Sequence, residues 1–176
     1  MPEKSTPEIQ LCVFLGNPGK NYEKTRHNIA WLAARHLPLY SSLTWQDKFK
    51  GRFCSPYLLP QTFMNLSGES VCACMSFYKI LPARLLVVHD DTELPFGTAG
   101  FRWGGGLAGH NGLRSIKQHL GTQEFWRFRL GIGRPQHGDL SSHVLGKFSP
   151  AEEAVLEDYL SRVMTALPQF LQKPAG

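Results

Sequence analysis

A short apolar segment that ends in a tight turn constrains the fold of this chain more than any other feature. Residues 11–15 read Leu-Cys-Val-Phe-Leu, and Gly16-Asn17-Pro18-Gly19 follows them directly. An apolar run bounded by turn residues is typical of a buried strand. Open α/β sheets bind ligands at the carboxyl ends of such strands. We therefore expect Asn17 and the nearby His27 to lie close together at a sheet edge.

The length of the chain favours a single domain. With 176 residues, of which 42% are hydrophobic, it can bury one substantial core and is too short for two ordinary domains. The first ten residues are polar, and no run approaches the roughly 18 apolar residues that would span a membrane. We expect one cytoplasmic, soluble domain over residues 1–176, with residues 1–9 as a polar N-terminal extension and no membrane partner.

A histidine near the start of the first predicted helix is a candidate base. Thr25 is expected to cap this helix, whose apolar positions recur at helical spacing and which Pro38 ends. His27 then lies in the first turn. Because the helix dipole disfavours a second positive charge there, we expect the imidazole to stay neutral near pH 7 and to accept a proton.

Residues 85–89 form the clearest buried strand, and three acids follow it. Asp90, Asp91 and Glu93 cannot all be buried without partners, because desolvating a charge is costly. A carboxylate that pairs with a histidine fixes its tautomer and supports base catalysis. A metal site is the competing interpretation, but the histidine and cysteine spacing that would complete it is absent. The four cysteines are expected to be reduced thiols.

A glycine-rich stretch over residues 104–112 lets the backbone approach a ligand closely, and the helix that follows offers free N–H groups. It is not a P-loop, since no Gly-Lys-Ser/Thr follows, and the Rossmann glycine spacing is also missing. We expect no nucleotide cofactor. Residues 125–132 then alternate as a strand that exposes Arg127 and Arg129 on one face, a plausible phosphate contact.

The net charge of +5 is unevenly distributed. Between residues 98 and 134 only Glu124 opposes six basic residues, which are Arg102, Arg114, Lys117, Arg127, Arg129 and Arg134. A basic face favours a polyanionic partner such as RNA or phosphate, although charge alone equally allows an ordinary solvated surface.

Other segments are less distinctive. Residues 51–60 predict a strand pair or one bent strand, and residues 62–69 a loop that runs into a helix. Residues 133–148 predict a mobile connection, because they are rich in Gly, His and Ser. Ser149-Pro150-Ala151-Glu152 is a capping-box start for a final amphipathic helix.

Six segments in order carry a resemblance to a known family. They are Gly16–Gly19 with Tyr22, Thr25–Asn28, Thr62–Gly68, His89–Asp91, Gly104–Gly106 with Gly109–Gly112, and Arg129–Gly133. Over roughly residues 11–165 the chain resembles the bacterial-type peptidyl-tRNA hydrolases. The resemblance implies a monomeric, single-domain, three-layer α/β/α fold with a twisted mixed sheet flanked by helices. It also implies hydrolysis, without metal or cofactor, of the ester that joins a peptide to tRNA.

The resemblance further assigns roles to individual residues. It makes His27 the general base that activates water, Asp90 the carboxylate that orients it, and Asn17 an active-site asparagine. The substrate-binding residues that it implies are Tyr22, Met64, Asn65, His110 and Asn111, and those for a tRNA phosphate are Arg102 and Arg129.

The chain departs from the family pattern in a few places. Leu107 and Ala108 replace a usual His-Gly, Asp91-Thr92-Glu93 replaces a common Glu-Leu-Asp, and Arg102 stands at what is commonly a lysine position. These changes affect the glycine-rich loop or the tRNA contacts rather than the proposed chemistry. Two alternative functions are a non-catalytic RNA-binding relative and a peptidase or phosphorylase on a similar three-layer fold. The second lacks metal ligands or a nucleophile motif.

Overall fold

A mixed, seven-stranded sheet forms the middle of the computed structural model, which describes residues 8–168 and 171. The strand order is β2-β3-β4-β1-β5-β7-β6. The strands are β1 (Leu11–Phe14), β2 (Gln46–Lys48), β3 (Gly51–Cys54), β4 (Tyr57–Pro60), β5 (Leu85–Asp91), β6 (Ala99–Trp103) and β7 (Trp126–Gly131). β4, β1, β5 and β7 run parallel, whereas β2, β3 and β6 pair antiparallel to their neighbours.

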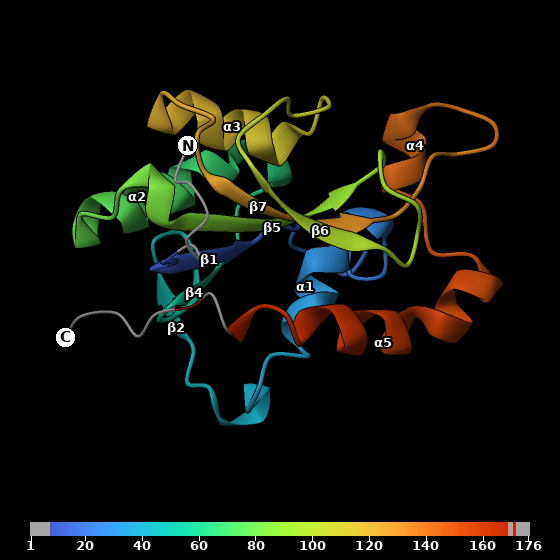
Figure 1. The fold of residues 1–176 in the computed structure, drawn as a ribbon, viewed down its shortest axis with the longest axis horizontal. Coiled ribbons are helices and arrows are strands. Elements are labelled where there is room, and N and C mark those ends of the chain that lie inside the picture. The colour runs from blue at the N-terminus through green and yellow to red at the C-terminus, as the bar shows by residue number, and fades with distance from the viewer. Residues whose placement is uncertain (1–7, 169–170, 172–176) are drawn as a thin grey trace.

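Helices cover both faces of this sheet. They are α1 (Ile29–Ala34), α2 (Ser67–Tyr78), α3 (Asn111–Leu120), α4 (Leu140–Val144) and α5 (Pro150–Met164), with short 3-10 turns η1 (Arg26–Asn28), η2 (Tyr40–Ser42), η3 (Met64–Leu66) and η4 (Pro82–Arg84). Figure 1 shows α2 and α3 on one side of the sheet and α1 and α5 on the other. The expected three-layer α/β fold is thus confirmed.

The alternation of side chains along the central strands divides the core in two. Cys12 and Phe14 of β1 pack with the α1 and α5 layer, whereas Leu11 and Val13 pack with the α2 and α3 layer. Such strands are buried on both faces, so their sequences are uniformly apolar. This explains why residues 11–15 are legible in the sequence.

Several predicted elements are confirmed and a few are not. The 51–60 pair is an antiparallel hairpin, and α5 begins with the expected capping box at Ser149. The Thr25 side chain does not cap a helix but donates from Oγ1 to the carbonyl oxygen of Tyr22 at 2.8 Å. The 133–148 connection contains the helix α4, because Asp139 caps it.

The predicted N-terminal extension is too long by at least one residue. Ile9 is fully buried in the core and forms a bridge with Leu171, while residues 1–7 lie outside the described residues. No helix in the described part of the chain is both long and apolar enough to cross a membrane.

The register of the parallel strands brings their carboxyl ends to one edge. Phe14 of β1 pairs with Val88 of β5, and Asp90 at the end of β5 pairs with Leu130 of β7. The turn after β1, the acids after β5 and the segment after β7 therefore meet at this edge, where open α/β sheets bind ligands.

Candidate active site

The turn after β1 is fixed by a buried asparagine, Asn28. Its Oδ1 accepts a hydrogen bond from the backbone N of Asn17 at 2.9 Å, and its Nδ2 donates to the carbonyl oxygen of Asn17 at 2.9 Å. Oδ1 of Asn17 in turn accepts from the backbone N of Met64 at 2.6 Å. Within the described residues, Nδ2 of Asn17 has no hydrogen-bond partner. This donor is therefore free to bind a ligand.

Asp90 lies between two histidines that come from opposite layers of the fold. Its Oδ2 is 2.7 Å from Nδ1 of His27, in the turn before α1, and its Oδ1 is 2.8 Å from Nε2 of His110, which caps α3. The side chains of Asp90, His27 and His110 are all almost completely buried. The end of β5 thus joins both helical layers.

The hydrogen bonds determine where the protons of the two imidazoles lie. Nδ1 of His110 accepts from the backbone N–H groups of Gly112 and Leu113 at 3.1 and 3.3 Å, so its proton is on Nε2 and is donated to Asp90. His27 donates from Nδ1 to the same carboxylate. Its Nε2 therefore carries the lone pair and, among described residues, has no partner.

The charges of this cluster shift two pKa values in opposite directions. Burial by itself raises the pKa of Asp90, but His27 and His110 outweigh burial and hold it well below its usual range. Burial by itself lowers the pKa of His27, but the charge of Asp90 and its hydrogen bond raise it above its ordinary value of 6.5. The helix dipole was expected to lower the pKa of His27, and this expectation is wrong, because His27 lies in a 3-10 turn beside a carboxylate.

A cavity of about 170 Å³ opens beside this cluster. Its walls are His27, the strand end His89–Thr92, the loop residues Leu107–Asn111, and Leu140, Ser141 and Val144 of the α4 segment. Ala108 in this loop has a φ of 50°, a conformation that glycine adopts more readily. Four of the predicted site residues, His27, Asp90, His110 and Asn111, thus line one cavity.

The remaining predicted substrate-binding residues form a second group around the first turn. Met64 is buried and binds Asn17, Asn65 is exposed in η3, and the half-buried Tyr22 ring lies edge-on to Phe63 at 6.4 Å. The two groups are joined at α3, since a Cβ on Gly112 would lie only 2.7 Å from Sδ of Met64. Glycine at this position lets the first residues of α3 pack closely against Met64.

The two predicted phosphate-binding arginines lie on the same face of neighbouring strands. Arg102 pairs in register with Arg127, so Arg102 and Arg129 are diagonal neighbours. Arg102 is exposed, whereas Nε of Arg129 donates to Oδ2 of Asp91 at 2.7 Å. Arg129 thus already has one anionic partner.

Arg127 is not exposed as the alternation predicted. Arg127 is only 2% exposed. Its Nη2 donates to the carbonyl oxygens of Gly104 and Gly106, both at 3.0 Å. Burial, and then the charges of Arg102 and Arg129, lower the pKa of Arg127 to about 10. Arg127 therefore anchors the glycine-rich loop, and the exposed face of β7 carries one arginine fewer than expected.

Sequence reasoning assigned no role to Asn28 or His89, which the structure places beside the site. His89 is buried, donates from Nδ1 to the carbonyl oxygen of Asp90 at 2.8 Å, and accepts at Nε2 from Arg127 at 3.4 Å. Burial, His110 and Arg127 lower its pKa to about 3, so it is neutral at physiological pH. The sequence signal that could have indicated a role for His89 is its position directly after four apolar strand residues.

The residues present do not fit a metal centre well. One ligand atom each from His27, Asp90 and His110 lies within 4.8 Å of the others. However, both histidine nitrogens that face Asp90 carry protons in this hydrogen-bond arrangement, and a metal ligand must be deprotonated. The other two acids are engaged, Asp91 by Arg129 and Glu93 by Arg134.

Fold and site together define a class of protein. It is an α/β protein that holds a histidine–aspartate pair at the carboxyl edge of its sheet, with one imidazole nitrogen free to take a proton from water. The chain belongs to the peptidyl-tRNA hydrolase family, a family of hydrolytic enzymes, because the sequence pattern described as "Peptidyl-tRNA hydrolase" matches residues 11–175.

Individual relatives agree with this assignment. The chain is 50% identical over 159 residues to the peptidyl-tRNA hydrolase of Treponema pallidum, covering 83% of this chain and 79% of the relative. It is 42% identical to that of Geotalea uraniireducens, covering 93% and 90%. The crystal structure of peptidyl-tRNA hydrolase from Acinetobacter baumannii superposes with a TM-score of 0.82 at 35% identity, covering 92% of this chain and 88% of that one.

Proposed function

We propose that His27 is the general base for hydrolysis of the ester between a peptide and the terminal ribose of tRNA. The observation that carries this proposal is the state of His27, which lines the cavity and whose Nδ1 is bound to Asp90. Its Nε2 has no partner among described residues. A base needs a free lone pair within reach of water. Asp90 orients the ring and supports the imidazolium that forms.

The reaction proceeds by attack of water on the ester carbonyl. Nε2 of His27 takes one proton of the water as its oxygen bonds to the carbonyl carbon. The ester C–O bond then breaks, and the proton passes from the imidazolium to the ribose oxygen. The products are a peptide with a free carboxyl group and a tRNA with a free terminal hydroxyl.

Amide side chains supply the polar contacts to the substrate. Nδ2 of Asn17 and the side chains of Asn111 and Asn65 have no other partner among the described residues, so they can bind the attacked carbonyl and the peptide backbone. An uncharged amide offers both donor and acceptor. Tyr22, Met64 and His110 complete the substrate site in this proposal. Because an aminoacyl-tRNA without an N-acyl group would leave such groups unpaired, the site distinguishes it from peptidyl-tRNA.

Arg102 and Arg129 bind a phosphate of the acceptor arm, because guanidinium groups make paired, charge-assisted hydrogen bonds to phosphate. We further propose that the chain acts as a single-domain monomer in the cytoplasm, as the family resemblance implies. The proposed chemistry needs no cofactor, since water, base and donors come from the protein and solvent.

The test is hydrolysis of an N-acetyl-aminoacyl-tRNA by the purified protein, with the same tRNA lacking the acetyl group as the matched control. We expect release of the acylated amino acid only from the acetylated substrate, and no effect of a chelator. Binding of tRNA without hydrolysis would instead favour the non-catalytic RNA-binding alternative. Loss of activity with the chelator would contradict the metal-independent mechanism.

A further inference from the structure

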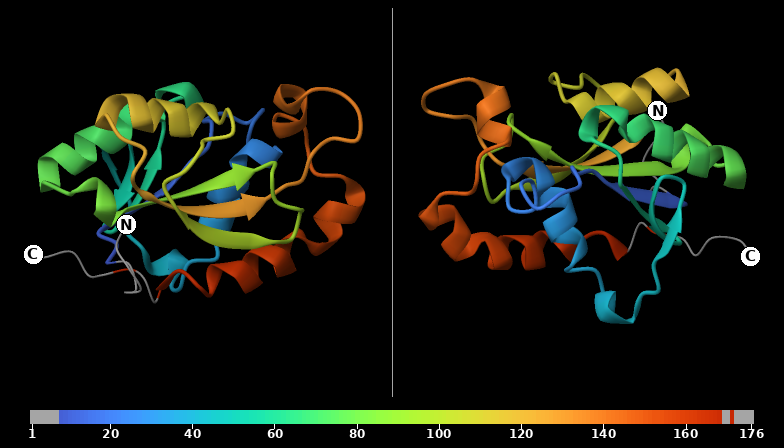
Figure 2. Two further views of the ribbon diagram at one scale, coloured as in Figure 1. Left: turned by 45° about the horizontal axis from the view of Figure 1, so that its top comes forward. Right: turned by 180° about the vertical axis from the view of Figure 1, so that it is seen from behind.

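The helix α4 packs only lightly against the rest of the fold. It has five residues, none of them fully buried, and of these Val144 packs against the core while partly buried. An isolated helix of this length is unstable in water, because nucleation is unfavourable and few hydrogen bonds repay it. Hydrogen bonds to other elements are therefore expected to matter for its position against the cavity. Figure 2 shows α4 near the start of α1, and α4 contacts the 3-10 turn η1 that precedes α1.

Arg26, the residue before the proposed base, supplies one attachment. Its Nη1 donates to the carbonyl oxygen of His143 in α4 at 3.3 Å, and its Nη2 donates to Oε1 of Glu152 in α5 at 2.9 Å. The same Oε1 accepts from the backbone N of Ser149 in the capping box. One guanidinium thus joins the turn of His27 to α4 and to the start of α5.

The backbone strengthens this junction. The backbone N of Arg26 donates to the carbonyl oxygen of Gly146 at 3.0 Å, and Thr25 forms an antiparallel bridge with Lys147. The Arg26 guanidinium carbon lies 5.9 Å from the centre of the Phe148 ring. The segment after α4 is therefore held along the residues that precede His27.

A second attachment fixes the other side of α4. Nε2 of His143 donates to the carbonyl oxygen of Gly133, just beyond β7, at 3.0 Å. With Arg26 on its carbonyl group and Gly133 on its ring, His143 connects the turn of His27 to the end of the sheet. Of the two partners of His143 named here, Arg26 comes from the segment of the base.

We propose that Arg26 is a positioning residue that holds α4 as a wall of the substrate cavity opposite His27. Leu140 and Val144 of α4 line that cavity together with His27. The Arg26 guanidinium fixes α4 relative to the base, in addition to the backbone contacts that hold the segment after α4. The wall contacts the acyl part of the substrate, and this last step rests on the proposed function. Arg26 itself does not touch the reacting atoms.

Lysine cannot replace arginine in this role. The guanidinium is a rigid fork that reaches the His143 carbonyl and the Glu152 carboxylate together, whereas an ammonium group is a compact point charge. Arg26→Lys therefore keeps the ion pair with Glu152 and loses the bond to α4. Glu152→Gln does the opposite, because glutamine also serves in a capping box but carries no charge.

The test measures hydrogen exchange of the backbone amides in 140–146 together with the kinetics of peptidyl-tRNA hydrolysis. We expect Arg26→Ala to speed exchange in α4 by about tenfold or more while β5 stays protected. We expect KM to rise about fivefold with kcat within about twofold, because the His27–Asp90 pair is untouched. Arg26→Lys should give intermediate effects on both measurements, and Glu152→Gln smaller ones.

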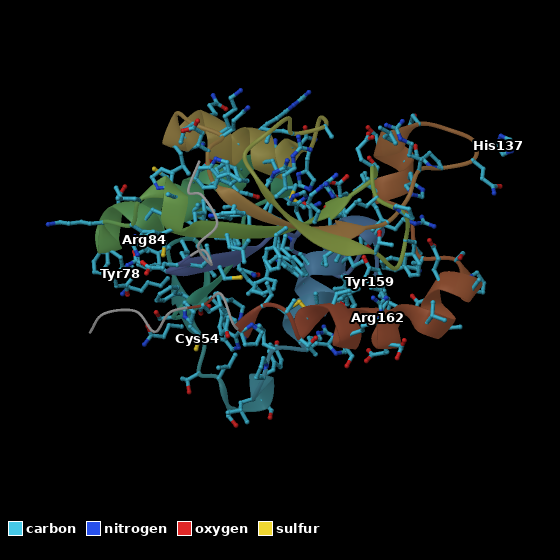
Figure 3. All side chains as sticks on the ribbon, viewed as in Figure 1. Cys54, Tyr78, Arg84, His137, Tyr159 and Arg162 are labelled. Carbon is cyan, nitrogen blue, oxygen red and sulfur yellow. The ribbon has the colours of Figure 1, made fainter. Side chains whose placement is uncertain are left out.

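Arg84→Ala is the matched control, since it removes an exposed Arg–Glu pair with Glu8. Figure 3 shows Arg84 at the end of the molecule away from α4. The proposal would be overturned if hydrogen exchange in α4 were unchanged in Arg26→Ala. If the alanine variant does not fold, Arg26→Lys takes its place in this comparison. Faster exchange with an unchanged KM would also overturn the proposal, because α4 would then not serve the substrate. If the unaltered chain fails to hydrolyse peptidyl-tRNA, the proposed function is wrong, and exchange still decides whether Arg26 holds α4.

Discussion

His110 donates a hydrogen bond from Nε2 to Oδ1 of Asp90 at 2.8 Å while its Nδ1 accepts two backbone N–H groups at the start of α3. The carboxylate that orients the proposed base is thus itself oriented by a helix cap. This geometry gives His110 a second candidate role beside the substrate contact that the sequence resemblance implies. The two roles lead to different mutant behaviour.

His110→Asn separates them. Asparagine is a good helix cap, but it is too short to reach Asp90, so the variant should fold normally and lose only the bond to the carboxylate. We expect kcat to fall about tenfold with little change in KM, because an interaction that matters in the transition state is weakened. Steady-state kinetics with an N-acetyl-aminoacyl-tRNA provide the measurement.

The control for cap loss alone is Ser149→Ala, which removes the capping box of α5 away from Asp90. It should lower thermal stability without changing kcat. A rise in KM for His110→Asn at unchanged kcat would instead assign His110 to substrate binding.

His27→Ala should abolish most turnover. Loss of a positioned general base costs a factor of about 10² or more, while affinity for tRNA and the cooperative unfolding transition should be retained. His137→Ala is the control, since Figure 3 shows His137 at the outer tip of the loop before α4. A near-normal rate constant of hydrolysis for His27→Ala in a single-turnover assay would show that His27 is not the base.

The raised pKa of His27 predicts the pH dependence of catalysis. Only neutral His27 can act as a base, so kcat/KM should fall as pH decreases through the pKa of His27. Because Asp90 raises that pKa, the midpoint of the acid limb should lie above 6.5, the ordinary value for histidine. A rate profile over pH 5 to 9 at constant ionic strength measures it.

Asp90→Asn should move this midpoint to lower pH and reduce the plateau rate. The charge and the hydrogen bond that raise the pKa of His27 are lost, so the ring deprotonates more readily, but the imidazolium formed during catalysis has less support. The loss of turnover should be smaller than that of His27→Ala. An unmoved midpoint would mean that Asp90 has only a structural role.

Replacement of both Arg102 and Arg129 by alanine tests the proposed phosphate site. The double variant should show a higher KM for peptidyl-tRNA and a weaker dependence of KM on salt, because phosphate contacts release counterions. Hydrolysis of a minimal N-acyl-aminoacyl-adenosine should change little. Arg102→Ala alone is the cleaner variant, since Arg129 also pairs with Asp91. Equal losses on both substrates would contradict a phosphate site.

The burial of Arg127 predicts a large effect on stability rather than on tRNA affinity. Arg127→Leu leaves the carbonyl groups of Gly104 and Gly106 without their donor, and the buried one, of Gly104, costs about 1–3 kcal/mol if it stays unsatisfied. We expect the free energy of unfolding to fall by about 1–3 kcal/mol in urea denaturation. The exposed Arg84→Ala should change it by less than about 1 kcal/mol. A similarly small change for Arg127→Leu would restore the prediction that this side chain is solvated.

Much of the fold can be predicted because its signals are local. The apolar run over residues 11–15, the strand over 85–89 and the capping box at Ser149 depend on a few neighbouring residues. The structure has a strand or helix at each of these positions. The place of the short helix α4 is not predictable in this way, because its cap Asp139 is local but its contact with Arg26 joins residues that are distant in sequence.

By itself, the sequence determined the kinds of chemical group available and the strands that carry them to one sheet edge. It indicated His27 and Asp90 because a base and a carboxylate follow buried strands. Only the tertiary structure decided that Asp90 lies between His27 and His110, that His27 has a raised pKa, and that Arg127 is buried. The physical reason is that alternation along a strand fixes which side chains share a face, but not what covers that face. The glycine-rich loop covers Arg127, and the meeting of two helical layers at the end of β5 sets the charges around His27.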